Sequence, residues 1–155
     1  MLFVQVETYQ QFIDDALGEI LEEHYEDLAL NQDKVPLDPQ LHVYREREKA
    51  GELLVMSLRE KGSNELAGYF IGFIAPGLHY QTCLTCTMDI FYVRPKFRDN
   101  LLAGRRLFKA VERELKIRGV DRWFVGTKLN KDVGRLFETL KFVPVEMYYA
   151  KWLGE

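Results

Sequence analysis

The chain has 155 residues, of which 47% are hydrophobic and 13% aromatic, and its formal net charge is −3. Such a chain is long and apolar enough to build the core of one domain, and its overall acidity argues against a nucleic-acid-binding protein. No apolar run reaches the roughly 20 residues that span a bilayer, and the N-terminus lacks the basic start and cleavage site of a signal peptide. We therefore expect a single soluble domain, residues 1–155, that works in the cytoplasm without a membrane or nucleic-acid partner.

The first half of the chain predicts a strand followed by helices. Residues 2–6 form a short apolar run typical of a strand, and Thr8 with Gln11 fits a capping box at the start of a helix. Side chains at helical spacing then predict one long amphipathic helix. They are Ile13, Leu17, Ile20, Leu21, His24 and Leu28. After a loop-like stretch, residues 40–50 predict a second helix or a turn, which Gly51 ends.

Three antiparallel strands are predicted next. Residues 53–58 and 66–75 flank a turn at a spacing that favours a hairpin, and residues 80–93 form the third strand. The third strand holds both cysteines of the chain, Cys83 and Cys86, at the C-x-x-C spacing of a redox pair or half a zinc site. Residues three apart on a strand point to opposite faces, and no second Cys or His pair completes a metal site. We interpret them as plain strand cysteines.

The last third of the chain predicts a helix, a strand, a helix and a final strand. Residues 102–115 have the apolar spacing of a helix that ends before Gly119, and residues 123–129 form a largely apolar strand suited to a sheet interior. The segment Asn130-Lys-Asp132 can cap a shorter helix, and residues 142–153 predict the last strand. The apolar face of that shorter helix comprises Val133, Leu136, Phe137 and Leu140.

Charge is unevenly distributed along the chain. Residues 1–65 carry 15 acidic and 6 basic side chains, a balance of −9, whereas residues 66–155 carry 9 acidic and 15 basic ones, a balance of +6. Residues 94–118 alone hold nine Lys or Arg against three acids. There, a strand feeds a loop with Arg98 and Gly104 onto a helix N-terminus, whose unpaired N–H groups and dipole favour a phosphate. The pattern predicts a polyanionic ligand, although an ordinary solvated helix face explains part of the charge.

The order of these parts resembles the acetyl-CoA motif of the GNAT superfamily of N-acetyltransferases. In this chain a hydrophobic strand ends in Val93-x-Pro95 and is followed by Arg98, Gly104 and a helix. The order of elements along nearly the whole chain is also similar to that family, and residues 135–142 resemble its closing helix. The resemblance implies an α+β fold, an α/β/α sandwich, with about four helices and a mixed, mostly antiparallel sheet in which a central strand pair splays apart.

A further pattern looks most similar to GNAT-like proteins encoded by tailed bacteriophages, which implies the host cytoplasm as the location. It comprises His79, Tyr80, Asp89, Tyr92, Val93, Pro95, Lys128 and residues 146–151.

The superfamily resemblance implies an acyltransferase that moves an acetyl group from acetyl-CoA, its cosubstrate, to a primary amine by direct attack in a ternary complex, with no metal. The pantetheine arm would lie against the splayed strand, and the pyrophosphate against the loop and the helix start. The residues implied in acetyl-CoA binding are Tyr92, Val93, Arg98, Leu102, Ala103, Gly104, Arg105 and Asn130. Close helix packing is an open alternative for Gly104. The acceptor, a small molecule or a protein, is expected to be cationic because the N-terminal half is acidic, and a homodimer stays open.

The sequence departs from the family pattern at the loop and in the closing helix. Leu101 stands at the first glycine position, and either Ala103 fills the second or one residue is inserted and Gly104 fills it. Asp99 puts a negative charge where phosphate is expected, and Phe137 replaces the usual tyrosine that protonates the departing thiolate. These departures favour an alternative, a non-catalytic GNAT-fold module that binds acyl-CoA or acts through protein contacts. A second alternative is an interaction protein whose basic helix holds an acidic partner.

An amine with a pKa near about 10 must lose a proton before it attacks, so a base is required. Asp89 is the predicted base. It lies four residues before Val93, and hence on the same strand face, and its apolar neighbours should desolvate the carboxylate and raise its pKa. A structural role, with a bond to a tyrosine, His79 or Lys128, stays open, and His79 and Glu146 are reserve bases.

The acid that protonates the thiolate is predicted to be Tyr148 or Tyr149. These two residues point to opposite faces of a strand, so at most one of them can face the cleft. Alternatively no acid is used, because a thiolate with a pKa of about 8–9 is already a tolerable leaving group.

Overall fold

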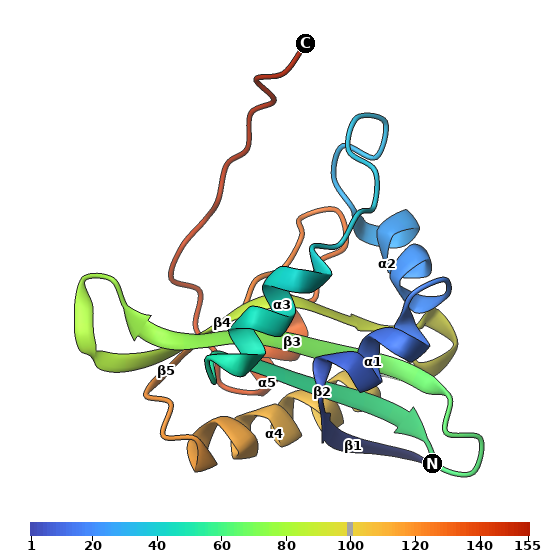
Figure 1. Ribbon diagram of the computed structural model, residues 1–155, viewed down its shortest axis with the longest axis horizontal. Helices are drawn as coiled ribbons and strands as arrows, with labels where there is room; N and C mark the ends of the chain where they lie inside the picture. Colours follow the sequence, from blue (N-terminus) through green and yellow to red (C-terminus); the bar gives the residue numbers. More distant parts are fainter. Residues whose placement is uncertain (99–100) are drawn as a thin grey trace.

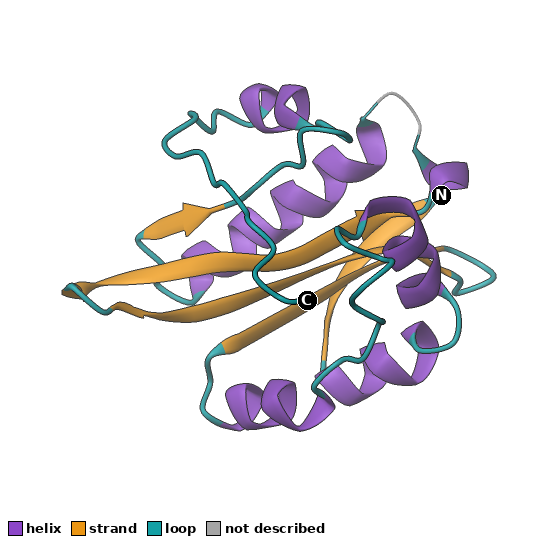
Figure 2. Cartoon of the chain, turned by 90° about the horizontal axis from the view of Figure 1, so that it is seen from above, coloured by secondary structure: helices purple, strands orange, loops and turns teal. Residues whose placement is uncertain are grey.

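The computed structural model of the chain describes residues 1–98 and 101–155. A five-stranded sheet with the order β1-β2-β3-β4-β5 is covered by helices on both faces (Figures 1 and 2). In chain order, the elements are β1 (Leu2–Glu7), α1 (Tyr9–Ala16), α2 (Ile20–Leu28), α3 (Leu41–Lys49), β2 (Leu53–Glu60), β3 (Leu66–Gly77), β4 (Tyr80–Val93), the 3-10 turn η1 (Pro95–Phe97), α4 (Leu102–Ile117), β5 (Arg122–Phe124) and α5 (Gly134–Thr139). The predicted α+β class is confirmed.

The sheet is mixed because one of its four strand pairs is parallel. β1 to β4 form antiparallel neighbours, and β5 runs parallel to β4. The β4–β5 ladder has three residue pairs and ends where Thr87 meets Phe124. β4 continues to Val93, and beyond Thr87 no described strand pairs with it on the β5 side. The predicted splay between these two strands is therefore confirmed.

Two apolar cores lie on opposite faces of the sheet. On one face, α4 and α5 pack through an aromatic cluster in which Phe108 stacks on Trp123, with ring centroids 5.5 Å apart. On the other face, helices α1 to α3 cover a core that includes Phe12, Tyr69 and Tyr92. Because each fully buried large apolar side chain contributes about 1.5–3 kcal/mol, these cores hold the helices firmly against the sheet.

The single helix predicted from the apolar spacing of residues 13–28 is two helices. The capping box is confirmed, since Thr8 Oγ1 accepts the Gln11 N–H at 3.2 Å and Gln11 Oε1 accepts the Thr8 N–H at 2.9 Å. α1 ends because Gly18 takes a left-handed backbone conformation, with φ of +85°, before α2 begins at Ile20. The apolar spacing continues across this turn, so periodicity alone did not reveal the break.

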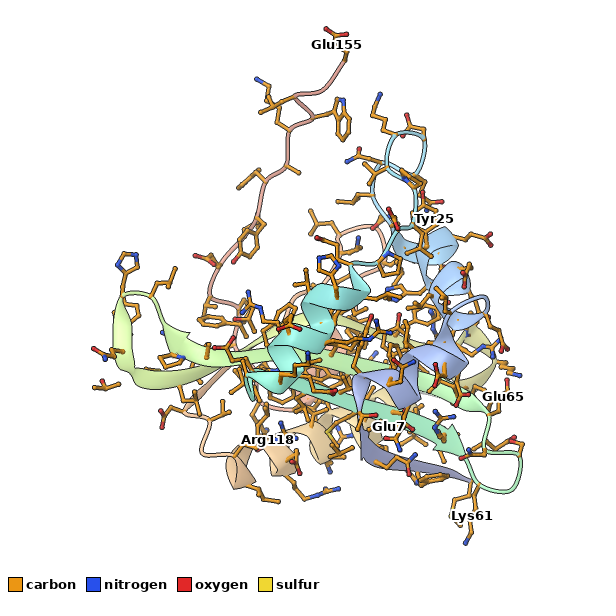
Figure 3. All side chains as sticks on the ribbon, in the orientation of Figure 1. Glu7, Tyr25, Lys61, Glu65, Arg118 and Glu155 are labelled. Atoms are coloured by element: carbon orange, nitrogen blue, oxygen red, sulfur yellow. The ribbon has the colours of Figure 1, made fainter. Side chains whose placement is uncertain are left out.

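Two strand predictions near the C-terminus were wrong in extent. The strand predicted over residues 123–129 is the three-residue β5, and residues 142–153 form no strand. Residues 143–155, which we call the C-terminal arm, run away from the body of the molecule towards Glu155 (Figures 1 and 3). A strand needs a neighbour for its backbone N–H and C=O groups, and the arm has no strand partner in the described part of the chain.

The cysteine interpretation agrees with the structure. Cys83 is partly buried, Cys86 is fully buried, and both are free thiols on β4. Over residues 1–98 and 101–155, no group of three or more His, Cys, Asp or Glu side chains is placed to hold a metal ion. Nor does any helix within these ranges combine the length and apolar character of a membrane span.

Candidate functional site

A β-bulge in β4 decides where Asp89 points. Consecutive residues of β3 pair with Ile90 and then with Met88, which leaves Asp89 as an extra residue in the ladder. An extra residue shifts the alternation of faces along the strand. Met88 and Val93 accordingly belong to the core under α4, whereas Ile90 belongs to the core under α1 to α3. The prediction that Asp89 shares a face with Val93 was wrong, because Asp89 reaches α3 on the other side of the sheet.

Asp89 is a partly buried carboxylate held by a phenol. Tyr44, on α3, donates its hydroxyl to Asp89 Oδ2 at 2.5 Å, and its ring stacks on Tyr9 with centroids 4.7 Å apart. Burial raises the pKa of Asp89, and the hydrogen bond from Tyr44 offsets part of that rise. The expected rise in pKa is thus confirmed, and so is the bond to a tyrosine that a structural role would also require.

An apolar cavity of about 320 Å³, here called the aromatic pocket, opens beside this pair. It lies between α1, the end of α2, the following loop and α3. Ile90 and Tyr44, the hydrogen-bond partner of Asp89, line it together with Tyr9 and Tyr25. The only acidic side chain in its lining is Asp38, so the pocket suits a mainly apolar or aromatic group with one cationic end.

A second cavity, of about 420 Å³, lies where β4 and β5 separate, and we call it the α4 pocket. Its walls come from the end of α2, the end of β4, the start of α4 and the segment leading into α5. The lining residues are Leu28, Phe91, Tyr92, Val93, Arg98, Leu101, Ala103, Gly104, Lys131, Asp132, Val133 and Leu136. Most of the residues predicted to bind acetyl-CoA are brought together here, whereas Leu102, Arg105 and Asn130 lie outside the lining.

The start of α4 lines this pocket through Leu101, Ala103 and Gly104. Leu101 is the N-cap, no side chain of residues 1–98 or 101–155 caps the helix, and the Leu101 carbonyl accepts the Arg105 N–H at 2.9 Å. The first-turn N–H groups have no intrahelical acceptor, and the helix dipole adds positive potential. Leu101 adopts a left-handed conformation, with φ of +67°, which glycine adopts without strain. Leu101 thus holds a backbone conformation that glycine favours. Asp99, predicted to oppose phosphate, lies outside the described residues.

Gly104 packs α4 against α5. A Cβ atom at this position would lie 2.9 Å from Leu136 Cδ2, closer than side-chain atoms normally approach. The absence of a side chain therefore lets α5 approach α4, which supports the helix-packing alternative. Ala103 is buried beside it, so the start of α4 presents backbone rather than bulky side chains to the pocket.

Arg98 and Lys131 are already paired at the mouth of the α4 pocket. Arg98 Nε donates to the Val93 carbonyl at 2.7 Å, and Arg98 Nη2 donates to Asp27 Oδ2 at 2.8 Å. Lys131 Nζ lies 3.3 Å from Asp27 Oδ1. The hydrogen bond from Arg98 is the main reason that the pKa of Asp27 is lowered. The sequence did not lead us to predict Asp27 as a site residue. Its position three residues after His24 places both side chains on one face of α2, and this spacing was the available signal.

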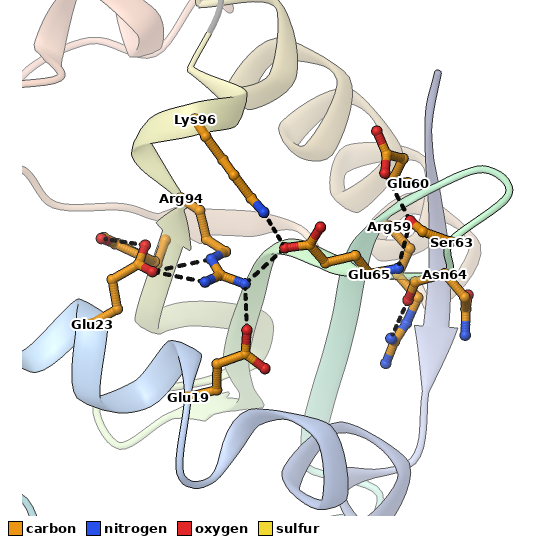
Figure 4. A network of polar contacts seen from close by, with 10 residues as sticks. Glu19, Glu23, Arg59, Glu60, Ser63, Asn64, Glu65, Arg94 and Lys96 are labelled. Atoms are coloured by element: carbon orange, nitrogen blue, oxygen red, sulfur yellow. Dashed lines mark hydrogen bonds and ion pairs between the residues drawn. The ribbon is translucent and has the colours of Figure 1, made fainter.

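A network around Arg94 fixes α2 against the end of β4 (Figure 4). Arg94 contacts Glu19 at 2.8 Å, Glu23 at 2.9 Å and Glu65 at 3.0 Å, and Lys96 also pairs with Glu65. Two of these acids come from the start of α2 and one from the turn between β2 and β3. Arg94 is therefore part of the scaffold that places Asp27 at the pocket mouth, and it is not a free cation for a ligand.

His24, on α2, packs behind Tyr92, which lines the α4 pocket. Its ring stacks on Tyr92 with centroids 4.5 Å apart, and Nδ1 is hydrogen-bonded to the Tyr69 hydroxyl. Burial lowers the pKa of His24 to about 4, and the positive charge of Lys128 adds to the effect. The imidazole is consequently neutral near pH 7. The reserve base His79 lies instead in the exposed turn between β3 and β4.

The closing helix differs from its prediction. α5 begins at Gly134 with Val133 as N-cap, so the expected capping role of Asn130 was wrong. Asp132 Oδ1 accepts the Gly134 N–H at 2.8 Å, and Thr127 Oγ1 accepts the Val133 N–H at 2.7 Å. These two side chains organise the turn because Asn130 lies too far ahead of the first helical residue.

None of the residues considered for the general acid lines either pocket. Phe137 is buried in the aromatic core, with its ring centroid 5.3 Å from that of Phe108. Tyr148 and Tyr149 are on the C-terminal arm, 87% and 89% exposed, and line neither pocket. The reserve base Glu146 is on the same arm and accepts a hydrogen bond that raises the pKa of Tyr148.

Solved structures with the same fold match nearly the whole chain. An aminoglycoside acetyltransferase from an uncultured soil metagenomic sample matches with a TM-score of 0.73 and 13% identity, over 100% of this chain and 99% of its own. Glucosamine-6-phosphate N-acetyltransferase from Arabidopsis thaliana matches with a TM-score of 0.70 and 12% identity, over 99% of both chains. A predicted acetyltransferase with acetyl-CoA from Clostridium acetobutylicum matches with a TM-score of 0.68 and 14% identity, over 99% of this chain and 97% of its own.

Sequence comparison adds no relative, since neither a protein-family profile nor a curated protein matches the chain. At 12–14% identity, the three structural matches establish the fold alone. The chain has the GNAT fold, as the resemblance predicted. A bacteriophage origin receives no support from these matches and stays a prediction.

Proposed function

We propose that the chain is an acetyltransferase that moves an acetyl group from acetyl-CoA to a primary amine by direct attack in a ternary complex. The observation that carries the proposal is the α4 pocket, where a splayed strand and the first turn of a helix share one cavity. Structures of the same fold include named acetyltransferases, one of them with acetyl-CoA.

On the donor side, the residues present fit the two chemical halves of acetyl-CoA. The first-turn N–H groups of α4 suit the pyrophosphate, and Arg98 and Lys131 can add charge when they release Asp27. Tyr92 and Val93, on the unpaired edge of β4, suit the pantetheine arm. Arg105, Leu102 and Asn130 flank this arrangement outside the pocket lining.

On the acceptor side, the aromatic pocket and Asp89 provide a place for the amine. Both pockets reach the end of α2, where Leu28 lines the α4 pocket and Ala29 lines the aromatic pocket. In the proposed reaction, Asp89 accepts a proton from the ammonium group, and the freed amine nitrogen bonds to the thioester carbonyl carbon. The nitrogen then loses its second proton to water, the carbon–sulfur bond breaks, and coenzyme A leaves as a thiolate or takes a proton from Tyr148 or Tyr149, which solvent reprotonates.

A non-catalytic GNAT-fold module remains the alternative, and specific observations favour it. Asp27 forms ion pairs with both Arg98 and Lys131. The buried Phe137 stands where many family members have a tyrosine in the closing helix. Such a module would bind acetyl-CoA without turnover, or would not bind it.

Thermal melting with and without acetyl-CoA tests the donor half of the proposal. Ligand that binds only the folded chain raises the melting temperature in proportion to the logarithm of its concentration. We expect a shift of several degrees at millimolar acetyl-CoA, with free acetate as the control. No shift at that concentration would reject the enzyme and the acyl-CoA-binding module together. A shift without thiol release towards any amine in a panel would favour the module.

A further inference from the structure

Arg122, on β5, is a partly buried cation without an acidic partner. Its Nε atom is buried and has no hydrogen-bond partner within residues 1–98 and 101–155, and none of the ion pairs formed there includes Arg122. The adjacent acid, Asp121, instead accepts the Leu84 N–H at 2.9 Å. A buried donor without an acceptor costs free energy, and folded proteins keep few such groups.

Two aromatic rings hold the Arg122 guanidinium in place. Its central carbon lies 5.3 Å from the ring centroid of Tyr80 and 4.9 Å from that of Phe124. A ring attracts a cation but offers no lone pair to its N–H groups, so these contacts restrict the side chain and leave its charge unpaired. Tyr80 is 60% exposed, and Arg122 is itself partly exposed. A ligand with a negative charge can therefore reach a cation that is already positioned.

The Arg122 site lies on the sheet face that Asp89 also reaches. In the β4–β5 ladder, Cys86 pairs with Trp123, and both belong to the core under α4. Arg122 precedes Trp123 and therefore points to the opposite face, where Asp89 contacts α3. Thr87, two residues before Asp89 on β4, is exposed. The β3–β4 hairpin extends beyond α3 at this end of the sheet, so this stretch of the face is open to solvent (Figure 1).

Strand geometry sets the distance between the Arg122 site and Asp89. Thr85, which pairs with Arg122, precedes Asp89 by four residues on β4. At about 3.3 Å per residue, the two positions lie roughly 13 Å apart along the strand. An extended chain of about four residues spans the same distance. A molecule that contacts both groups must therefore be as long as a short peptide.

We propose, on the basis of the proposed function, that Arg122 binds a carboxylate of the acyl acceptor and that this acceptor is a peptide with its terminal amine at Asp89. Arginine matches a carboxylate because its fork of N–H donors meets both oxygens. One guanidinium carries a single charge, whereas a phosphate carries nearly two. Arg47, which contacts the Phe73 ring on β3, is already paired with Glu52 at 3.3 Å. The spacing places the carboxylate on the fourth or fifth residue of the peptide.

An NMR titration of the nitrogen-15-labelled chain tests the Arg122 site without acetyl-CoA. The probes are peptides of five alanine residues with a free N-terminal amine and an amidated C-terminus, either unchanged or with aspartate at positions four and five. In the wild type, the aspartate peptide should shift the Arg122 Nε–H signal and bind about tenfold more tightly than the alanine peptide. Moving both aspartates to positions two and three should remove most of this preference.

Three variants separate the Arg122 site from general charge. Arg122→Gln should bind both peptides equally, and Arg122→Lys, which keeps the charge but loses the fork of donors, should retain part of the preference. Arg113→Gln removes an exposed cation of α4 and is the matched control, which should keep the full preference. Melting temperatures check that each variant is folded.

Equal affinity of the wild type for the two peptides would overturn the proposal, and so would a preference that survives in Arg122→Gln. Tighter binding of a phosphoserine peptide than of the aspartate peptide would overturn the choice of a carboxylate. Failure of the proposed function looks different. In that case the aspartate peptide binds through Arg122, yet no thiol is released when acetyl-CoA is added.

Discussion

The α4 pocket and the aromatic pocket lie on either side of the end of α2, and they are built in different ways. The α4 pocket is formed mainly by backbone, namely an unpaired strand edge and a helix start, with two cations held by Asp27. The aromatic pocket is formed by side chains, among them Tyr44, whose hydroxyl bonds to the partly buried carboxylate of Asp89. A backbone site tolerates sequence change, as Leu101 shows, whereas a side-chain site depends on a few residues in their places.

Removal of the Asp89 carboxylate tests whether the two pockets have separate roles, and it should have the largest effect. Asp89→Asn should lower turnover with an accepted amine by about 100-fold or more, because it removes the proposed base. The melting-temperature shift caused by acetyl-CoA should be unchanged, since the donor is held by the other pocket. Tyr44→Phe is the matched control; it removes the hydrogen bond and should raise the pKa that limits turnover. Equal turnover in Asp89→Asn and wild type would reject the base assignment.

The stability of the fold should respond to pH through His24, whose ring stacks on Tyr92 of the α4 pocket. Its pKa is about 4 in the folded chain, below the ordinary value of 6.5, so the unfolded chain binds more protons between these values. Stability is therefore present above pH 6.5 and is lost as the pH falls, by about 2 kcal/mol on approaching pH 4.5. Urea unfolding at several pH values should show this loss in the wild type and much less of it in His24→Gln.

Asp89 provides an opposite contribution that must be separated from that of His24. Its raised folded pKa means that the folded chain binds more protons just above pH 4, so protonation of Asp89 stabilises the fold as the pH falls. The difference between wild type and His24→Gln removes this contribution because both chains retain Asp89. Identical pH profiles for the two chains would contradict the assignment of a buried neutral imidazole.

Removal of the negative charge of Asp27 tests how the cations of the α4 pocket contribute to acetyl-CoA affinity. Asp27→Asn should free Arg98 and Lys131 for phosphate and tighten acetyl-CoA binding about fivefold at low salt, with a smaller gain at high salt. Calorimetric titration measures the change. Asp33→Asn, an exposed acid in the following loop, is the control and should leave affinity unchanged. Weaker binding in Asp27→Asn would indicate that Asp27 positions the cations for the ligand.

The smallest expected effect concerns the strained residue at the start of α4. Leu101→Gly should stabilise the fold by about 0.5–1 kcal/mol, because a non-glycine residue with a positive φ is strained. Leu102→Gly, one residue into the helix, should destabilise it by about 1 kcal/mol. Thermal melting of the two variants compares them directly. A loss of stability in both would contradict the backbone conformation described for Leu101.

Much of the fold follows from local patterns in the sequence. The capping box at Thr8, the helix before Gly51 and the strands β1 to β4 were predicted because alternation and turn residues act over short distances. The break at Gly18 was missed because the apolar spacing runs through it. The extent of β5 and of the arm could not be predicted, since a strand exists only where another strand accepts its hydrogen bonds.

The candidate site was predictable where it depends on chain order and unpredictable where it depends on register. The β4 end and the α4 start were located from one motif, and they line one cavity. The bulge at Asp89 is invisible in the sequence because it is a property of the pairing with β3. The bridge made by Asp27 joins residues 71 positions apart, Asp27 and Arg98, and no local pattern reveals such a contact.

A crystal structure with acetyl-CoA bound tests the central claim most directly. The account predicts that the pyrophosphate accepts hydrogen bonds from the first-turn N–H groups of α4, and that Arg98 or Lys131 has turned from Asp27 towards phosphate. The thioester should lie along β4 near Tyr92, with its carbonyl carbon open towards Asp89. Acetyl-CoA bound elsewhere on the chain, or an α4 pocket that stays empty at saturating ligand, would contradict the account.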